Sequence, residues 1–182
     1  MRLKYSARLV AAISVQSLDG THVFVGLHAY DRDHKDGLHD QLRVEQMHDV
    51  LRHIAQLDPK SSVIAGDLNS MYPDTLSARL LKKAGVIAGL LPSKNPGEKQ
   101  SHLERVGSLS QRLSAMAIGG SIKLLENLGY VDADMQHAGT IRSGIIHADL
   151  DHFFGKGVSF SDFEKYENIL SDHDALTARI TY

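Results

Sequence analysis

The sequence predicts one α/β domain, and three observations support this prediction. The chain has 182 residues, enough for a single domain with a sizeable core. Its hydrophobic content of 42% and its charged content of 23% are ordinary for a globular protein. Strand-like runs alternate with segments of helical periodicity, an order that is typical of α/β proteins. Residues 1–182 are therefore expected to form one domain.

The first predicted element is an antiparallel hairpin over residues 7–28. Residues 7–15 form an apolar run with β-branched side chains, and residues 23–28 read Val-Phe-Val-Gly-Leu-His. The pair Asp19-Gly20 between them is a strong hairpin signal.

A loop, a helix and a buried strand are predicted next. Residues 31–40 are polar and predict a loop. Apolar residues recur at helical spacing over 39–57, and Asp58-Pro59 ends that helix. A short apolar run over 61–66 predicts a buried strand.

The second half of the chain predicts helices first and strands afterwards. Pro92 ends one helix, Gly119-Gly120 breaks another, and Gly129 lies at the C-terminal end of a third. The predicted elements are helices over 76–91, 99–118 and 121–128, a strand over 130–133, a loop over 135–146, and strands over 148–154, 157–160 and 175–181.

Composition and charge exclude several classes of protein. The net charge is -2 at pH 7, so the chain as a whole is not a basic nucleic-acid binder. It has no cysteine, which excludes a disulfide framework, a thiolate nucleophile and a cysteine-based zinc site. No apolar run reaches the length of a membrane span, and the N-terminus has no signal-peptide pattern. A cytoplasmic protein with no membrane span is therefore expected.

The stretch from Val63 to Ser70 is the most informative part of the sequence. Its apolar residues predict a buried strand, and Gly66 allows the backbone to turn tightly. Asp67 and Asn69 follow two residues apart, so an extended backbone would place both side chains on one face. A carboxylate beside an amide suits a divalent cation and a phosphate oxygen. The alternative is a strand that ends in an Asx-type turn.

Other polar residues lie at the ends of predicted strands. Buried carboxylates in such places are costly unless they are paired or bind a metal. Two carboxylates, an amide and two imidazoles that converge at strand ends could bind Mg²⁺ and cleave a phosphate ester. The residues are His28, Asp67, Asn69, Asp151, Asp172 and His173.

Together these motifs resemble the endonuclease/exonuclease/phosphatase family, whose members hydrolyse phosphoesters with Mg²⁺ or Mn²⁺. The similar features are the strand-end His28, the Gly-Asp-x-Asn motif, the strand around Asp151, and the Ser-Asp-His motif before the last strand. Their order and spacing match over residues 7–75 and 119–181. The resemblance implies a two-sheet β-sandwich flanked by helices, which is a four-layer αββα fold.

The resemblance also implies a metal site with Mg²⁺ or Mn²⁺ as the cofactor. Asp67 would approach the metal and the attacking water, and Asn69 would orient the phosphate or the water. Asp172 would be a metal ligand. With His173, these residues make up the implied metal-binding set.

The implied catalytic residues are His28, Asp67, Asn69, Asp151 and His173. His173 would act as a base or stabilise the pentacoordinate phosphate, and Asp151 would hold its ring. His28 matches the strand-end His of the deoxyribonuclease and sphingomyelinase branches and is a candidate acid for the leaving oxygen. The implied function is hydrolysis of a phosphodiester or phosphomonoester by in-line water attack. The substrate would be a nucleic acid, a phospholipid or a small molecule.

The sequence departs from the family pattern at its N-terminal side. The metal-binding Glu of the family has no counterpart, because the first Glu is Glu45 in the predicted helix over 39–57. We therefore expect the sandwich to be N-terminally incomplete, with an open sheet edge. Either another chain supplies the missing strands in a homo-oligomer, or an N-terminal segment is missing. The alternative function is that of a catalytically impaired family remnant that acts as a binding module.

Three further features receive structural interpretations. His152 is interpreted as a strand-surface residue and not as a ligand. Gly119-Gly120 is interpreted as a helix breaker, since no glycine-rich phosphate fingerprint follows a strand there. Residues 76–118 contain seven Lys or Arg against two Glu and are similar to a basic helical insertion. Its basic residues form either a surface for anionic partners or the solvent-exposed face of amphipathic helices.

Overall fold

The computed structural model of the chain describes residues 9–29, 39–72, 119–134, 140–143, 146–168, 170–171 and 173–182. The predicted helices over 76–91 and 99–118 lie outside these residues, and so do the basic insertion and Asp172.

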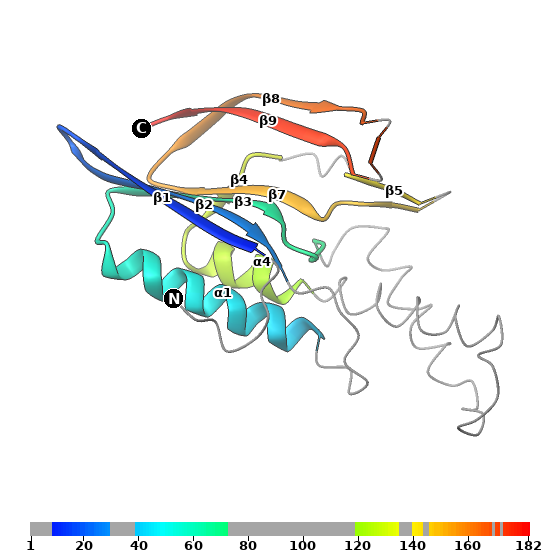
Figure 1. Ribbon diagram of the computed structural model, residues 1–182, viewed down its shortest axis with the longest axis horizontal. Coiled ribbons are helices and arrows are strands. Elements are labelled where there is room, and N and C mark those ends of the chain that lie inside the picture. The colour runs from blue at the N-terminus through cyan, green and yellow to red at the C-terminus, as the bar shows by residue number, and fades with distance from the viewer. Residues whose placement is uncertain are drawn as a thin grey trace.

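A mixed five-stranded sheet forms the centre of the structure (Figure 1). In spatial order its strands are β1 Leu9–Ser17, β2 Gly20–His28, β3 Ser61–Asp67, β7 Asp151–Lys156 and β4 Val131–Asp132. The pair β2–β3 is parallel, whereas the other neighbouring pairs are antiparallel. A parallel pair requires a crossover, and the chain between β2 and β3 includes helix α1. The antiparallel pairing of β1 with β2 confirms the predicted hairpin over 7–28 from Leu9 onward, and residues 7 and 8 lie outside the described residues.

The described helices cover one face of this sheet (Figure 1). They are α1 His39–Gln56 and α4 Gly120–Asn127. On β2, the alternate residues Val23, Val25 and Leu27 are buried in one hydrophobic cluster with apolar residues of α1. The residues from α1 are Met47, Val50 and Ile54. Alternate residues of β2 and helically spaced residues of α1 therefore pack against each other in the core. No helix in the described part of the chain is long and apolar enough to cross a membrane.

An antiparallel hairpin covers the opposite face of the sheet (Figure 1). Its strands are β8 Ser159–Tyr166 and β9 Ala175–Thr181. The ring of Phe160 lies so close to Gly155 on β7 that a Cβ at this glycine would overlap it. Tyr182 follows β9 and contacts the rings of His22 and Phe24 on β2, at centroid separations of 4.5 and 6.2 Å. The hairpin therefore packs on the sheet as a second β-layer.

Part of the hairpin-side face remains exposed over β1. Ile13 and Val15 pair with Phe24 and His22, so they lie on the face that Tyr182 contacts. Their exposed fractions are 65% and 46%, which is high for large apolar side chains within a strand.

The fold agrees with the predicted architecture in part. It is a mixed α/β arrangement, mostly β, with a helical layer, a central sheet and a second β-layer. Among the described residues this second layer has two strands, fewer than a complete second sheet would contain. The four-layer arrangement therefore remains a prediction.

Three predictions of secondary structure differ from the structure. The strand predicted over 148–154 begins only at Asp151 as β7, and residues 149–150 lie outside any strand. The predicted loop over 135–146 contains the strand β5 Ile141–Ser143 and the first residue of β6 Ile146–Ala148. The strand predicted over 157–160 continues to Tyr166 as β8. After Phe160 most of its side chains are exposed, so no alternation of apolar residues marked the strand.

Candidate metal and catalytic site

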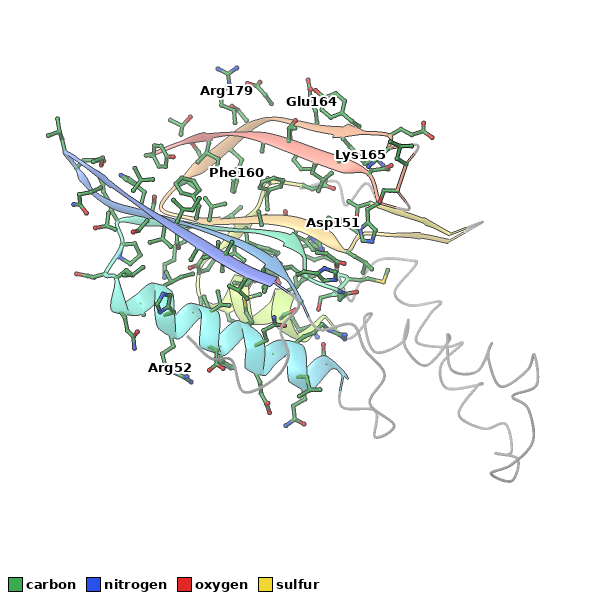
Figure 2. All side chains as sticks on the ribbon, viewed as in Figure 1. Arg52, Asp151, Phe160, Glu164, Lys165 and Arg179 are labelled. Carbon is green, nitrogen blue, oxygen red and sulfur yellow. The ribbon has the colours of Figure 1, made fainter. Side chains whose placement is uncertain are left out.

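Three strand ends meet at one end of the central sheet. Because β2 and β3 are parallel, their last residues, His28 and Asp67, lie at the same end of the sheet. Strand β7 runs antiparallel to β3 and pairs Asp67 with its own first residue, Asp151. Asp151 and Gly155 alternate onto the same face of β7, which is the face that the β8–β9 hairpin covers. Figure 2 shows Asp151 close to the end of that hairpin.

Gly66 brings the end of β3 against the end of β2. Its φ of 130° is rare for any residue with a side chain, and a Cβ there would overlap the carbonyl oxygen of Leu27. The backbone N–H of Ala29 donates to the carbonyl oxygen of Asp67 at 2.7 Å. Gly66 therefore allows the close approach that places Asp67 beside His28.

The Gly-Asp-x-Asn motif forms a tight hydrogen-bonded turn. The backbone N–H of Asn69 donates to Asp67 Oδ1 at 2.8 Å, which is the geometry of an Asx-type turn. Asn69 is buried with a φ of 48°, and its Nδ2 donates to the carbonyl oxygen of Ala29 at 3.1 Å. The Asx-type turn that the sequence allowed as the alternative for this motif is thus present. The side chain of Asn69 also links the end of β3 to the residue after β2. Its predicted role toward a phosphate stays a prediction.

His173 and Asp151 form the closest side-chain pair of the site. His173 lies just before β9, and its Nδ1 is 2.7 Å from Asp151 Oδ2. A carboxylate can only accept, so Nδ1 donates in this hydrogen bond. The sequence predicted this contact. Both side chains are partly buried, with exposed fractions of 29% and 18%.

His28 lies on the other side of Asp67. Its Nε2 is 3.5 Å from Asp67 Oδ2, which is long for a hydrogen bond but within the range of an ion pair. Its side chain is 36% exposed, so its ring can reach a bound molecule.

A metal ion could be held by Asp67, Asp151 and His173. One ligand atom from each of these residues lies within 4.8 Å of the other two. Two carboxylate oxygens and an imidazole nitrogen are groups that bind divalent cations, and the identity of the metal stays a prediction. Asp67 and His173 belong to the set that the sequence predicted, whereas Asp151 was predicted only to hold His173. The side-chain amide of Asn69 donates to the carbonyl oxygen of Ala29, and Asp172 lies outside the described residues.

Burial raises the pKa of Asp67. The negative charge of Asp151 raises it further, whereas the backbone hydrogen bond from Asn69 and the charges of His173 and His28 lower it. A divalent cation at this position would favour the ionised form of the carboxylate.

A second polar network, buried except for the partly exposed Tyr72, lies directly behind the site. His152 is 1% exposed, so its interpretation as a strand-surface residue is wrong. Its Nδ1 lies 2.9 Å from Asp132 Oδ2, and its Nε2 lies 2.9 Å from the carbonyl oxygen of Ser70. The hydroxyl of Tyr72 donates to the same Asp132 oxygen at 3.1 Å. The signal was present in the sequence, because His152 alternates with Leu150 and Phe154 and therefore shares their buried face.

The charges of this network shift two pKa values. Burial raises the pKa of Asp149 to about 7, with further contributions from Asp134 and Asp132. Burial opposes the charged form of His152. The hydrogen bond to Asp132 and the charge of Asp149 outweigh that effect and raise the pKa of His152 to about 9.

No protein-family model matches this sequence, and no curated protein matches it.

Proposed function

We propose that the chain is a metal-dependent phosphoric ester hydrolase similar to the endonuclease/exonuclease/phosphatase family. One observation carries this proposal: Asp67, Asp151 and His173 come from three separate segments and place their ligand atoms within 4.8 Å of one another. His28 adds a second imidazole 3.5 Å from Asp67. Carboxylates and imidazoles at one sheet edge are the groups that metal-assisted hydrolysis requires.

Mg²⁺ or Mn²⁺ would be held by the carboxylates of Asp67 and Asp151, and Asp172 and Asn69 are the further ligands that the sequence predicts. When bound, such a cation neutralises phosphate charge and lowers the pKa of coordinated water. Asp67 Oδ1 already accepts a hydrogen bond from Asn69, which fixes the orientation of the carboxylate. The site therefore offers one oriented oxygen ligand before any ion binds.

Acid–base chemistry would fall to the two histidines. Asp151 accepts from Nδ1 of His173, so the neutral ring has an unprotonated Nε2 that can take a proton from water. The carboxylate also stabilises the imidazolium that forms. His28 is the candidate acid for the leaving oxygen because it is partly exposed on the other side of Asp67.

We also propose the four-layer αββα sandwich, with a second sheet that extends beyond the β8–β9 hairpin. The exposed apolar side chains of Ile13 and Val15 support it, because they lie on the hairpin side of the central sheet. Further strands at this position would cover them. They would come from another copy of the chain, which could also bring a further carboxylate to the site.

Hydrolysis of bis(4-nitrophenyl) phosphate with Mn²⁺ or Mg²⁺ tests the proposal, with plasmid DNA as a second substrate. We expect metal-dependent release of nitrophenolate that EDTA abolishes and that His173→Gln reduces to background. Glu126→Gln is the matched control, because it changes an exposed acidic residue on α4. Mn²⁺ binding without hydrolysis of either substrate would contradict the enzymatic proposal and favour the impaired binding module.

A further inference from the structure

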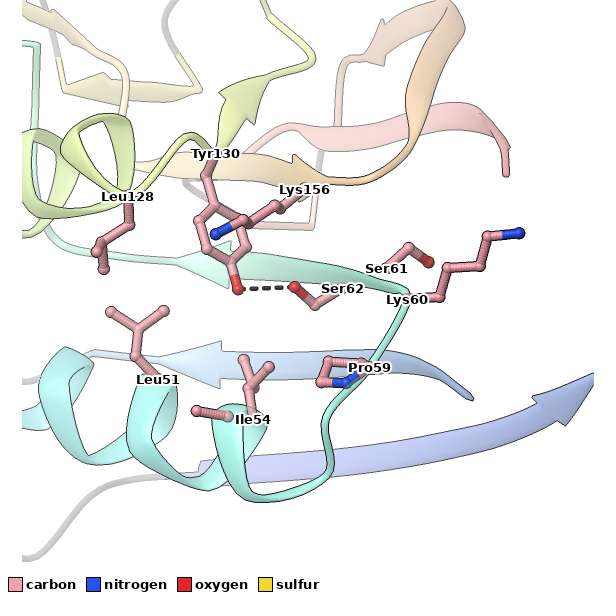
Figure 3. A pocket seen from close by; sticks show the side chains of 10 residues that line it. Leu51, Ile54, Pro59, Lys60, Ser61, Ser62, Leu128, Tyr130 and Lys156 are labelled. Carbon is pink, nitrogen blue, oxygen red and sulfur yellow. Dashed lines mark hydrogen bonds between the residues drawn. The ribbon is translucent and has the colours of Figure 1, made fainter. Parts of the chain in front are cut away.

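A cleft opens at the other end of the sheet, on the helix-covered face (Figure 3). Its volume is about 250 Å³. It lies between the C-terminal part of α1, the segment after α4, and the first residues of β3. The apolar walls are formed by Leu51, Ile54, Pro59, Leu128 and the ring of Tyr130.

One ammonium group at this cleft is available to a ligand. Lys156 ends β7, and its Nζ lies over the ring of Tyr130 at 5.9 Å from the centroid. Among the described residues no carboxylate pairs with Lys156. The other lysine of the cleft, Lys60, is 2.5 Å from Asp19, and Figure 3 shows its amine directed away from Tyr130. The cleft therefore offers one uncompensated positive charge.

A buried hydroxyl pair offers a hydrogen bond at the same place. Ser62 Oγ and the Tyr130 hydroxyl are 2.7 Å apart, and the two residues are 3% and 5% exposed. One hydroxyl donates to the other, so the accepting hydroxyl still has a proton to donate. In the described part of the chain neither hydroxyl has another partner. An acceptor in the cleft would satisfy this remaining donor.

The volume and the lining restrict the size of the ligand. A closed apolar cavity of about 150 Å³ is sufficient for benzene, whereas drug-sized ligands occupy roughly 300–1,000 Å³. A cleft of about 250 Å³ therefore fits one aromatic ring or a short alkyl chain with one polar group. A single ammonium beside a hydroxyl donor selects a monoanion.

We propose that the cleft between α1 and β3 binds a small carboxylate with an apolar body, such as an aromatic or short-chain acid. The apolar body would pack between Leu51, Ile54 and Leu128. The carboxylate would accept from the Ser62–Tyr130 hydroxyl pair and lie near the Lys156 ammonium. This site is separate from the candidate catalytic site and does not depend on the function proposed for it.

Titration of benzoate into the ¹⁵N-labelled full chain, followed by NMR, tests this proposal. Benzyl alcohol is the neutral probe with the same ring. We expect benzoate to shift the amide signals of Ser62, Leu128 and Tyr130 saturably, and to bind about three- to tenfold more tightly than benzyl alcohol.

Two lysine variants separate the cleft from general charge effects. Lys156→Gln should lower the affinity for benzoate to that for benzyl alcohol, whereas Lys123→Gln on the exposed side of α4 should not change it. Ala55→Leu should abolish binding of both probes, because it fills the cleft from an exposed helix position. Absence of saturable shifts at the cleft would overturn the proposal. Equal affinities for benzoate in the wild type and in Lys156→Gln would also overturn it.

Discussion

The two ends of the β3–β7 strand pair carry opposite chemistry. At one end the register pairs Asp67 with Asp151, and at the other it pairs Ser62 with Lys156. The acidic end faces the β8–β9 hairpin and gathers histidines, whereas the basic end faces the helices and gathers apolar side chains. The strand pair β3–β7 therefore carries an acidic surface on the hairpin side and a basic surface on the helix side. The alternation of side chains along each strand determines on which side a residue lies.

The separation between these ends makes them electrostatically independent. Five residues of extended strand span about 17 Å, roughly twice the Debye length at physiological ionic strength. Charge changes at one end should therefore have little effect on the other, so each end can be tested alone.

Gly66→Ala should have the largest effect, because it acts on the backbone that forms the acidic end. The new Cβ would overlap the carbonyl oxygen of Leu27, and φ is 130°. We expect a loss of about 4 kcal/mol or more in the free energy of unfolding, measured by urea denaturation. The matched control is Gly129→Ala, which has φ of 80° but no atom within 4 Å of the new Cβ, and it should cost about 1 kcal/mol. Equal losses for the two variants would mean that the contact with Leu27 is not critical.

Asp151→Asn should lower the catalytic activity at the acidic end. The amide cannot stabilise a protonated His173, so kcat on bis(4-nitrophenyl) phosphate should fall about 100-fold or more while KM changes little. Steady-state kinetics measures both constants, with Glu126→Gln as the control at an exposed acidic position. Unchanged turnover in Asp151→Asn would remove the Asp151–His173 pair from the mechanism.

The network behind the acidic end should make stability depend on pH. His152 has a raised pKa of about 9 in the folded state, above the ordinary value of 6.5. The folded protein therefore binds more protons between these values, and stability should fall as pH rises from 6.5 to 9. We expect a loss of about 3 kcal/mol in the free energy of unfolding over this window.

Urea denaturation at several pH values measures this slope, and His152→Gln should flatten it. The Gln variant should also be less stable at pH 6.5, because Asp132 loses a buried partner. Identical slopes in both proteins would show that another group is responsible.

The smallest effect is expected at the exposed apolar face over β1. Ile13 is 65% exposed, so Ile13→Lys should change the free energy of unfolding of the single chain by less than about 0.5 kcal/mol. Urea denaturation at two protein concentrations, with mass in solution by light scattering, measures this. A large loss that depends on protein concentration would show that another copy covers this face.

Sequence periodicity predicted the framework of the site well. The apolar run over 23–28 and the helical spacing over 39–57 predicted β2 and α1, and a helix between two strands allows the parallel β2–β3 pair that the structure has. Because the two strands run in the same direction, His28 and Asp67 lie at the same end of the sheet. This part was predictable because it depends on local patterns and on a general rule of strand connection.

Other parts of the site depend on contacts that no local pattern reports. The need for glycine at position 66 comes from the Leu27 carbonyl on a neighbouring strand. The proximity of Asp151 to Asp67 comes from the register of an antiparallel pair between distant segments. For the same reason the sequence did not predict Asp151 as a member of the candidate metal-binding group. It predicted only the contact of Asp151 with His173.

The position of His173 just before β9 also has a consequence for the order of folding. This histidine joins the β8–β9 hairpin to the central sheet through its hydrogen bond with Asp151. The outer side of the β8–β9 hairpin is exposed, so the hairpin should open before the central sheet unfolds. The candidate site is then the last part of the fold to assemble and the first to be lost. Hydrogen exchange at the β9 amides would report its integrity before any global unfolding.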